Sequence, residues 1–338
     1  MHRESSKTKN QKAKKRARKK KRDRFVINAV ILAVAAVIVV ITANLSGAGN
    51  VKDEKPQENA PIQSEAVKDG GTQAAVEGNV STDAAVRFDF IDVGQGDSAL
   101  ITTPNKEYIL VDAGTADSDK LLKHLEARSV DELDYLILSH PHSDHIGSAE
   151  DILEKYKVNC VIMSEAEATT RTFERLYDAL MLEKQSSGCK VYSAKIKDKY
   201  NIDGCVIDII GPVNCDEDNL NNCSVCFTFT YGEFDALFTG DTEATAEKEL
   251  LSAGYVSDCE LYKVAHHGSD TSSSERFIAE VNPEVSVISC GKDNSYGHPS
   301  TEILERLSAV GSEIYITAEC GTVTVLSDGK EYSVSSER

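Results

Sequence analysis

A run of 21 residues without a charged side chain, FVINAVILAVAAVIVVITANL at positions 25–45, divides this chain into two chemically different parts. At about 1.5 Å per residue, a helix of that length crosses a hydrocarbon layer about 30 Å thick. The 24 residues before it hold 13 Lys or Arg against two acids, and such a basic flank stays in the cytoplasm. The pattern predicts a disordered basic cytoplasmic tail over 1–24, a transmembrane signal anchor over 25–45 and an extracytoplasmic remainder. A cleaved signal peptide is the alternative, although its apolar region is usually shorter.

The segment after the apolar run has the composition of a tether. Residues 46–83 are rich in Gly, Ala, Glu, Lys and Gln and contain no aromatic residue, which predicts a flexible linker. Residues 84–338 are long enough for one large α/β domain with a substantial core. Without the 13 basic and two acidic residues of the tail, the chain keeps 24 basic and 53 acidic residues, a formal charge of about −29. A domain so acidic is no general polyanion binder, so any nucleic acid would have to be held locally.

Apolar runs of strand length alternate with helical patterns from residue 86 onward. Strands are expected at 86–93, 98–103, 107–113, 133–139, 159–163, 205–210, 224–231, 234–240, 260–265 and 284–290, with further strands closing the chain. Helices are expected at 117–128, 148–156, 169–184, 245–254, 273–281 and 301–310. Three linked strands at the start exclude a plain parallel doubly wound sheet. The order favours two sheets flanked by helices.

The nine cysteines are an odd number, scattered through expected strands and loops. This arrangement is not typical of a disulfide framework. Cys223 and Cys226 have C-x-x-C spacing, but the chain has no second pair of this kind. Packing in the core is therefore favoured over a zinc knuckle for these two residues.

The densest motif is SHPHSDHIGS at 139–148, where an expected strand passes into a helix. In an extended segment His140 and His142 point the same way and can bind one ion. Asp144 and His145 then turn at the helix entrance and face a second position. Gly147 allows another segment to pass close by. Taken alone, such a motif could equally be a polar loop.

Other strand ends carry the same kinds of side chain. ALFTGD ends in Asp241, YKVAHHGS contains His266 and His267, ILVDAG contains Asp112, and SYGHPS places His298 in a turn. A carboxylate at a strand end can bridge two metal ions, and imidazole suits zinc, manganese or iron. Six of the eight histidines fall in three short motifs after apolar strands, which favours a metal site over a polar loop. The other two, His2 and His124, are expected to be solvated.

These motifs resemble those of the metallo-β-lactamase superfamily. SHPHSDHIG matches its His-x-His-x-Asp-His signature, and VDAG and TGD resemble its flanking aspartate motifs. Within the superfamily, FIDVGQGDSALI, NNCSV, LFTGDTE, VAHHGSDTSS and YGHPS resemble, in the same order, the extracellular hydrolase-like domain of ComEC-type competence DNA-uptake proteins. The resemblance extends over about residues 86–330. It implies an αββα sandwich with the site at the edges of the sheets.

The resemblance also implies roles for individual residues. The expected metal ligands are His140 and His142 for one ion, Asp144, His145 and His266 for a second ion, and Asp241 as the bridge between them. The expected catalytic residues are Asp144, Asp112, which would orient the histidine loop, and His298, which would hold a substrate phosphate or a transition-state oxygen. His267 is either a ligand in place of His266 or a residue that supports the ligands from behind, and His266 is ranked ahead of it because of its position at the strand end. The cofactor implied is one or two divalent ions, with zinc first and manganese as the alternative.

One departure from the family pattern concerns the first metal position. Many members have a further histidine about twenty residues before the bridging aspartate, and here Asn221 or Asn222 stands in that place. The first position therefore has two histidines and a shared aspartate. Asp97 or Gln95 could compensate, although a tight turn with a buried carboxylate explains these two residues equally well.

The sequence thus favours a membrane-anchored extracytoplasmic metal-dependent hydrolase, a phosphodiesterase or nuclease related to competence and DNA uptake. The partners expected are the membrane, through residues 25–45, and nucleic acid or another phosphodiester, with no nucleotide cofactor. A small or cell-wall phosphoester is the alternative substrate, and a β-lactam is a further one because fold alone does not set the substrate. A non-catalytic surface-binding module is the alternative of another class. The retention of six ligand candidates argues against that alternative.

Overall fold

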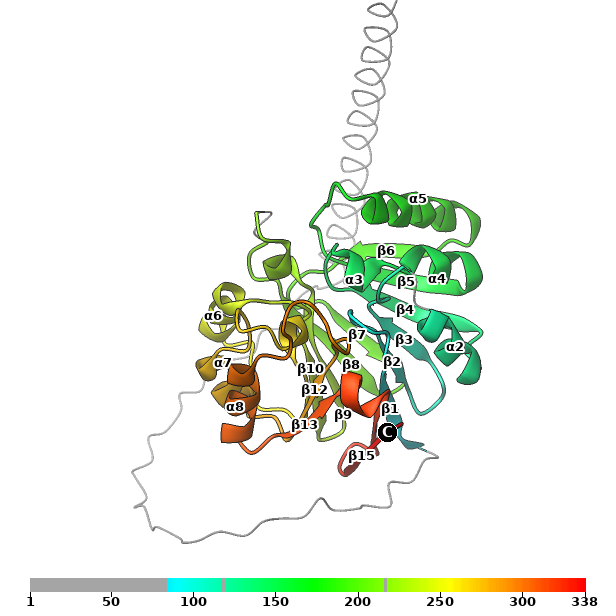
Figure 1. The fold of residues 1–338 in the computed structure, drawn as a ribbon. Helices are drawn as coiled ribbons and strands as arrows, with labels where there is room; N and C mark the ends of the chain where they lie inside the picture. Colours follow the sequence, from blue (N-terminus) through cyan, green and yellow to red (C-terminus); the bar gives the residue numbers. More distant parts are fainter. Residues whose placement is uncertain (1–83, 117–118, 216–217) are drawn as a thin grey trace, which may run out of the picture. The chain divides into compact units, whose positions relative to one another are not determined.

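The computed structural model describes residues 84–116, 119–215 and 218–338. In this part of the chain, two β-sheets face each other and helices cover their outer faces, as Figure 1 shows. The expected αββα arrangement is therefore present. The expected cytoplasmic tail, signal anchor and linker over residues 1–83 lie outside the described residues. Within the described residues, no helix has the length and apolarity to span a membrane.

The first sheet has eight strands in the order β15-β14-β1-β2-β3-β4-β5-β6. Its strands are β1 (Val86–Phe90), β2 (Ala99–Thr102), β3 (Tyr108–Val111), β4 (Glu132–Leu138), β5 (Lys157–Met163), β6 (Lys190–Ser193), β14 (Val323–Ser327) and β15 (Tyr332–Ser336). Pairing is antiparallel from β15 to β3 and parallel from β3 to β6. The three linked strands at the start of the domain explain this change of direction.

The second sheet has seven strands in the order β13-β12-β11-β10-β9-β8-β7. Its strands are β7 (Lys199–Ile202), β8 (Cys205–Gly211), β9 (Cys226–Tyr231), β10 (Phe234–Phe238), β11 (Leu261–Lys263), β12 (Val285–Ile288) and β13 (Glu313–Ile316). Strands β10 to β13 are parallel, so their carboxyl ends reach the same edge of the sheet.

The core between the sheets is rich in aromatic side chains. The rings of Phe88 and Phe229 meet edge to face at 5.3 Å, and those of Phe227 and Phe238 stack at 4.8 Å. All four are at most 3% exposed. Because side chains alternate along a strand, the inward residues of both sheets fill this one layer.

The helices bury their apolar faces on the outer sides of the sheets (Figure 1). On the first sheet lie α2 (Asp119–Ala127), α4 (Ala149–Lys155) and α5 (Arg171–Ser186), and on the second lie α6 (Ala244–Ala253), α7 (Glu275–Val281) and α8 (Thr301–Ala309). Short turns complete the described part: α3 (Ser143–Ile146), η2 (Leu220–Cys223), η3 (Ala265–Gly268) and α9 (Thr317–Cys320).

One expectation was wrong here, because the α2 residue His124 is not solvated: its side chain is 15% exposed and its Nε2 lies 3.3 Å from Asp89 Oδ2.

Gly147 stands where two segments of the first sheet touch. Its backbone is right-handed helical, with φ −57° and ψ −49°, so the position requires space rather than backbone freedom. Its N–H donates to the carbonyl of Gly114 at 2.7 Å, and a Cβ would lie 2.5 Å from that oxygen. The close approach expected from the sequence is confirmed.

We predict that Gly147→Ala destabilises the protein by about 3 kcal/mol, because the added methyl group forces the two segments apart. Urea denaturation measures the loss. Gly204→Ala is the control, since nothing lies within 4 Å of a Cβ there and only its positive φ of 78° is strained, which costs about 1–2 kcal/mol. A loss no larger than that of the control would contradict the prediction.

Candidate metal centre

Three strand ends meet at one edge of the sandwich. After β4 comes the 139–148 motif, which contains α3 and leads into α4, whereas β10 ends just before Asp241 and β11 leads into η3 with its two histidines. The N–H of His266 donates to the carbonyl of Gly240, and the N–H of Val225 donates to that of Ser139. The second of these bonds joins a loop of the first sheet to a loop of the second sheet, whereas the first joins two neighbouring loops of the second sheet.

The side chains at this edge form three groups that could each hold an ion, and the third, made of Asp97, Asp112 and His145, shares His145 with the second. In the first group, His140 Nε2 lies 2.9 Å from His142 Nδ1, and Asp241 completes the set. The second group contains Asp144, His145 and His267. In each group one donor atom per residue lies within 4.8 Å of the others.

The carboxylate of Asp241 lies between the first and second groups. Its Oδ1 is 3.1 Å from His145 Nε2, and its Oδ2 is 3.6 Å from His140 Nε2 and 3.8 Å from His267 Nε2. Asp241 is only 2% exposed. A carboxylate in this position can serve both groups at once, which is the geometry of a bridge.

The two adjacent histidines of η3 take different directions. Both have left-handed backbones, with φ 50° at His266 and 56° at His267, a conformation that costs about 1–2 kcal/mol for such residues. His267 is buried and its Nε2 lies 3.3 Å from Asp144 Oδ2. His266 faces Glu243 and Thr271, and its Nε2 is 3.8 Å from Asp241 Oδ2. Among the described residues, one of the groups able to hold an ion contains His267, and none contains His266.

Three donor atoms at this edge fit a cation. His145 Nε2, His267 Nε2 and Asp241 Oδ1 are all buried and make no hydrogen bond of normal geometry within the described part of the chain, although His145 Nε2 lies 3.1 Å from Asp241 Oδ1 and His267 Nε2 lies 3.3 Å from Asp144 Oδ2. Buried polar atoms are normally hydrogen-bonded, because leaving them unpaired costs free energy. Imidazole nitrogen and carboxylate oxygen are the donors that zinc and manganese accept.

Asp112 fixes the orientation of this group from behind. It accepts hydrogen bonds from the N–H and Oγ of Ser139, both at 2.7 Å, and its Oδ2 lies 2.8 Å from His145 Nδ1. This contact leaves His145 Nε2 pointing at Asp241. Ser139 was not among the residues expected from the sequence, because a serine at a strand end carries no signal of such a role.

The pKa values reflect the crowding of carboxylates and imidazoles. Burial alone would lower the pKa of His145, but the charges of Asp241 and Asp112 raise it well above its ordinary value. The pKa of His267 rises to about 10, because Asp241 and Asp97 outweigh its burial. Burial, helped by the charge of His145, keeps the pKa of His140 well below its usual range. A divalent cation competes with such imidazole protons for the same nitrogen atoms.

Residues 91–292 match the family model described as the metallo-beta-lactamase superfamily, and this match covers more than half of the chain. The chain belongs to this superfamily. Its members are mostly metal-dependent hydrolases, and the fold typically binds divalent metals.

Three curated relatives within or near this superfamily are similar to most of the described domain. The chain is 29% identical over 253 residues to ComE operon protein 3 of Bacillus subtilis, covering 70% of this chain and 32% of that protein. It is 30% identical over 245 residues to Recombination protein 2 of Haemophilus influenzae, with coverage of 71% and 28%. It is 28% identical over 235 residues to Competence protein ComA of Neisseria gonorrhoeae, with coverage of 69% and 31%. The resemblance expected from the motifs is confirmed, and the chain spans about a third of the length of these relatives.

The turn before β2 contributes a buried ion pair to this metallo-β-lactamase site. Lys263 Nζ lies 2.8 Å from Asp97 Oδ2, and both side chains are 6% exposed. Asp97 Oδ1 is 3.5 Å from His267 Nδ1. The neighbouring Gln95 turns elsewhere, since its Oε1 accepts the N–H of Gly291 at 3.0 Å. The lysine inside the apolar run LYKVA was the one sequence signal for this pair.

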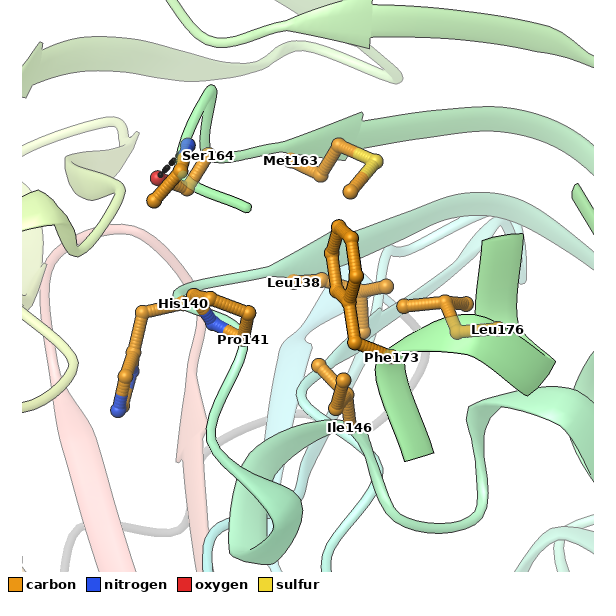
Figure 2. A pocket seen from close by; sticks show the side chains of 9 residues that line it. Leu138, His140, Pro141, Ile146, Met163, Ser164, Phe173 and Leu176 are labelled. Atoms are coloured by element: carbon orange, nitrogen blue, oxygen red, sulfur yellow. Dashed lines mark hydrogen bonds between the residues drawn. The ribbon is translucent and has the colours of Figure 1, made fainter. Parts of the chain in front are cut away.

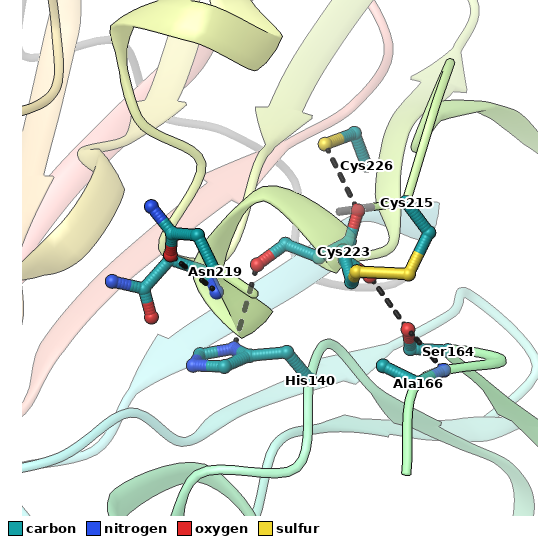
Figure 3. Close-up of a disulfide and its surroundings, with 9 residues drawn as sticks. His140, Ser164, Ala166, Cys215, Asn219, Cys223 and Cys226 are labelled. Carbon is teal, nitrogen blue, oxygen red and sulfur yellow. Dashed lines mark hydrogen bonds between the residues drawn. A yellow bond between two sulfur atoms is a disulfide. The ribbon is translucent and has the colours of Figure 1, made fainter. Parts of the chain in front are cut away.

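The loop between β8 and β9 supports His140, as Figure 3 shows. Ser224 Oγ lies 3.4 Å from His140 Nδ1 and accepts the N–H of Asp241 at 3.0 Å. A disulfide joins Cys215 to Cys223 next to this serine. The expectation of simple core packing was therefore wrong for Cys223, whose partner eight residues away has no diagnostic spacing, whereas Cys226 is a buried free thiol.

Asn221 and Asn222 occupy the place of the missing histidine and make different contacts. Asn222 Oδ1 accepts the N–H of Glu243 at 3.0 Å. Asn221 donates through Nδ2 to Glu243 Oε1 at 3.0 Å, and the same nitrogen lies 3.5 Å from His266 Nε2. Asn221 Oδ1 is buried and has no hydrogen-bond partner among the described residues.

A small pocket behind His140 contains apolar side chains, as Figure 2 shows. Pro141 and Phe173 are among the residues that line it, and its volume is about 10 Å³, roughly that of one water-sized probe. It is too small for a substrate. Its lining instead contributes to the burial that lowers the pKa of His140.

We predict that Lys263→Met costs about 3–5 kcal/mol of unfolding free energy, because it leaves Asp97 buried without its cation. Lys199→Met is the matched control, since the Lys199–Asp208 pair is mostly exposed, with side-chain exposures of 59% and 28%, and such pairs contribute less than about 1 kcal/mol. Chemical denaturation of both variants gives the comparison. Equal losses would show that the buried pair has no special weight.

Proposed function

We propose that this chain is a membrane-anchored extracytoplasmic metal-dependent phosphodiesterase that acts on nucleic acid. The observation that carries the proposal is the convergence of two metal-capable groups on Asp241, where three buried donor atoms face other ligand candidates without a hydrogen bond of normal geometry in the described structure. A structural cluster of polar residues would satisfy those atoms with hydrogen bonds.

The ligands proposed for the first ion are His140, His142 and Asp241, and those for the second are Asp144, His145, His267 and Asp241. His266, expected as a ligand from the strand-end argument, is proposed instead to orient Glu243 and Thr271 beside the bridge. A divalent cation held by these residues would supply Lewis acidity, which lowers the pKa of a bound water and offsets charge on a phosphoryl group.

The remaining chemistry is assigned to side chains around the ions. Asp144 is 29% exposed, so its carboxylate can reach solvent and accept a proton from the attacking water. The new bond joins the water oxygen to phosphorus while the bond to the leaving oxygen breaks. His298 Nδ1 is buried without a partner among the described residues, and it would donate to a phosphoryl oxygen as charge develops. Asp112 would keep His145 in the required tautomer.

Nucleic acid is the proposed substrate because the names of the relatives refer to processes that involve DNA. Two of them are named as a competence protein and a recombination protein. The charge of about −29 outside the basic tail argues for a local grip on one or two nucleotides rather than for a long basic groove. The same charge favours a small or wall-linked phosphodiester as the second candidate.

The proposed location outside the cytoplasm has one structural support. Cys215 and Cys223 form a disulfide, and disulfides persist mainly in oxidising compartments. The proposed anchor at residues 25–45 lies outside the described structure.

We predict that the purified full-length chain binds one or two divalent ions and cleaves a phosphodiester, and that His145→Ala lowers kcat by at least about a hundredfold. The reason is that the variant removes a donor and leaves Asp241 unbalanced. Metal content is measured by elemental analysis and cleavage with single-stranded DNA and bis(4-nitrophenyl) phosphate. His124→Asn is the control, because it removes an imidazole outside the site. The proposed enzymatic activity would be refuted if the wild-type protein contained no metal and cleaved both substrates no faster than His145→Ala.

We also predict a shallow salt dependence for DNA cleavage. If one or two phosphates are held, kcat/KM falls by about three- to sevenfold between 50 and 200 mM salt, since each contact contributes a slope of about −0.7 for single strands. The chromogenic phosphodiester should show almost no change. Cleavage of that small ester with no cleavage of DNA at any salt concentration would favour the second candidate.

A further inference from the structure

A row of aromatic rings leads from the metal centre to solvent. The ring of His267 lies 6.4 Å from that of His298 at an interplanar angle of 24°, and His298 lies 5.7 Å from Tyr296 at 25°. His267 is buried, His298 is partly buried and Tyr296 is 69% exposed. We infer that Tyr296 is a stacking platform for the nucleobase next to the scissile phosphodiester. This inference rests on the proposed function.

The exposure of Tyr296 stands out within the described part of the chain. Three large hydrophobic side chains are exposed there: Leu182 at 65%, Tyr192 at 43% and Tyr296 at 69%. A single exposed tyrosine is ordinary on a protein surface. Tyr296 differs because it stacks on His298, and His298 in turn stacks on His267, a proposed metal ligand.

The loop that carries Tyr296 is held in place by a side chain dedicated to it. Asn294 Oδ1 accepts the N–H groups of Tyr296 and His298, at 3.2 and 3.0 Å. Asn294 Nδ2 donates to the carbonyls of His298 and Gly291, at 2.6 and 3.0 Å. Four hydrogen bonds from one amide therefore fix the spacing between the two rings. Such a preformed loop loses little freedom when a ligand stacks on it.

Both ends of the same loop are hydrogen-bonded to segments that carry residues of the site. At its start, the N–H of Gly291 donates to Gln95 Oε1. At its end, the N–H of Ser300 donates to the carbonyl of Gly268 in η3, at 2.9 Å. A Cβ on Gly268 would lie 2.7 Å from the Pro299 side chain, which shows how closely the loop packs on the turn that carries His267. Tyr296 thus has a defined position relative to the proposed ligands.

A nucleobase is the ligand that suits this surface. The acidic chain offers little attraction for a run of phosphates, so the affinity must come from another source. Every base has a π-face, and stacking on an aromatic side chain needs neither positive charge nor a particular sequence. Tyr296 is the solvent-exposed end of the row of rings that begins at His267, so a base stacked on it would hold the strand beside the centre.

The test compares Tyr296→Ala and Tyr296→Phe with the wild-type full-length chain. The matched control is Tyr192→Ala, an exposed tyrosine on β6. The substrates are oligothymidylate and an abasic oligodeoxynucleotide of the same length. We expect Tyr296→Ala to raise KM for oligothymidylate by about tenfold, with kcat within twofold of wild type and no change for the abasic strand. Tyr296→Phe and Tyr192→Ala should match wild type.

Two results would overturn the inference while leaving the phosphodiesterase intact. One is an equal change in KM for both strands, and the other is a fall in kcat alone, which would mean that Tyr296 only supports His298. Anisotropy of fluorescein-labelled oligothymidylate measures binding separately from cleavage. If neither strand is cut, the proposed nuclease activity fails. Weaker binding by Tyr296→Ala than by Tyr296→Phe would still support the platform, and equal binding would reject it.

Discussion

The buried carboxylate of Asp241 is the contact on which the arrangement of the site depends. It faces His140 and His145 from one sheet and His267 from the other. A charge so deeply buried is costly unless opposite charge lies against it. The imidazoles of His145 and His267, whose pKa values are raised, can supply that charge. Asp112, Ser139 and Ser224 orient the rings of His145 and His140. The seam between the sheets is therefore polar at this edge and aromatic in the interior.

Much of the fold follows from local pattern, and what was missed had physical reasons. Apolar runs predicted strands β1 to β5 and β8 to β12 with shifts of a few residues, because their side chains are buried. Strands β6 and β7 were missed, since KVYS and KYNI alternate exposed and half-buried positions and lack a hydrophobic signature. The alternation of elements predicted two sheets flanked by helices, and the family resemblance implied the αββα layers. The order of the strands within each sheet was not predicted.

The site was predictable wherever a donor follows a strand directly, as with His140, His142 and Asp241. It was not predictable at η3, because two consecutive left-handed residues reverse which histidine faces inward. Lys263 and Asp97 are 166 residues apart, and a pairing over that separation has no local signature. The disulfide between Cys215 and Cys223 was not predicted either, because their spacing of eight residues fits no recognised motif.

The donors of the centre are spread from residue 140 to residue 267 and reach it from both sheets. A chain with only its first half made has the His-x-His motif but neither Asp241 nor the η3 histidines. Ion binding is therefore linked to completion of the whole sandwich, and any ion bound only by the native state adds to its free energy of unfolding. In a chain that crosses a membrane before it folds, this order of events delays metal capture until the entire domain has emerged. The metal content of such a protein would reflect the ions of the compartment in which it folds.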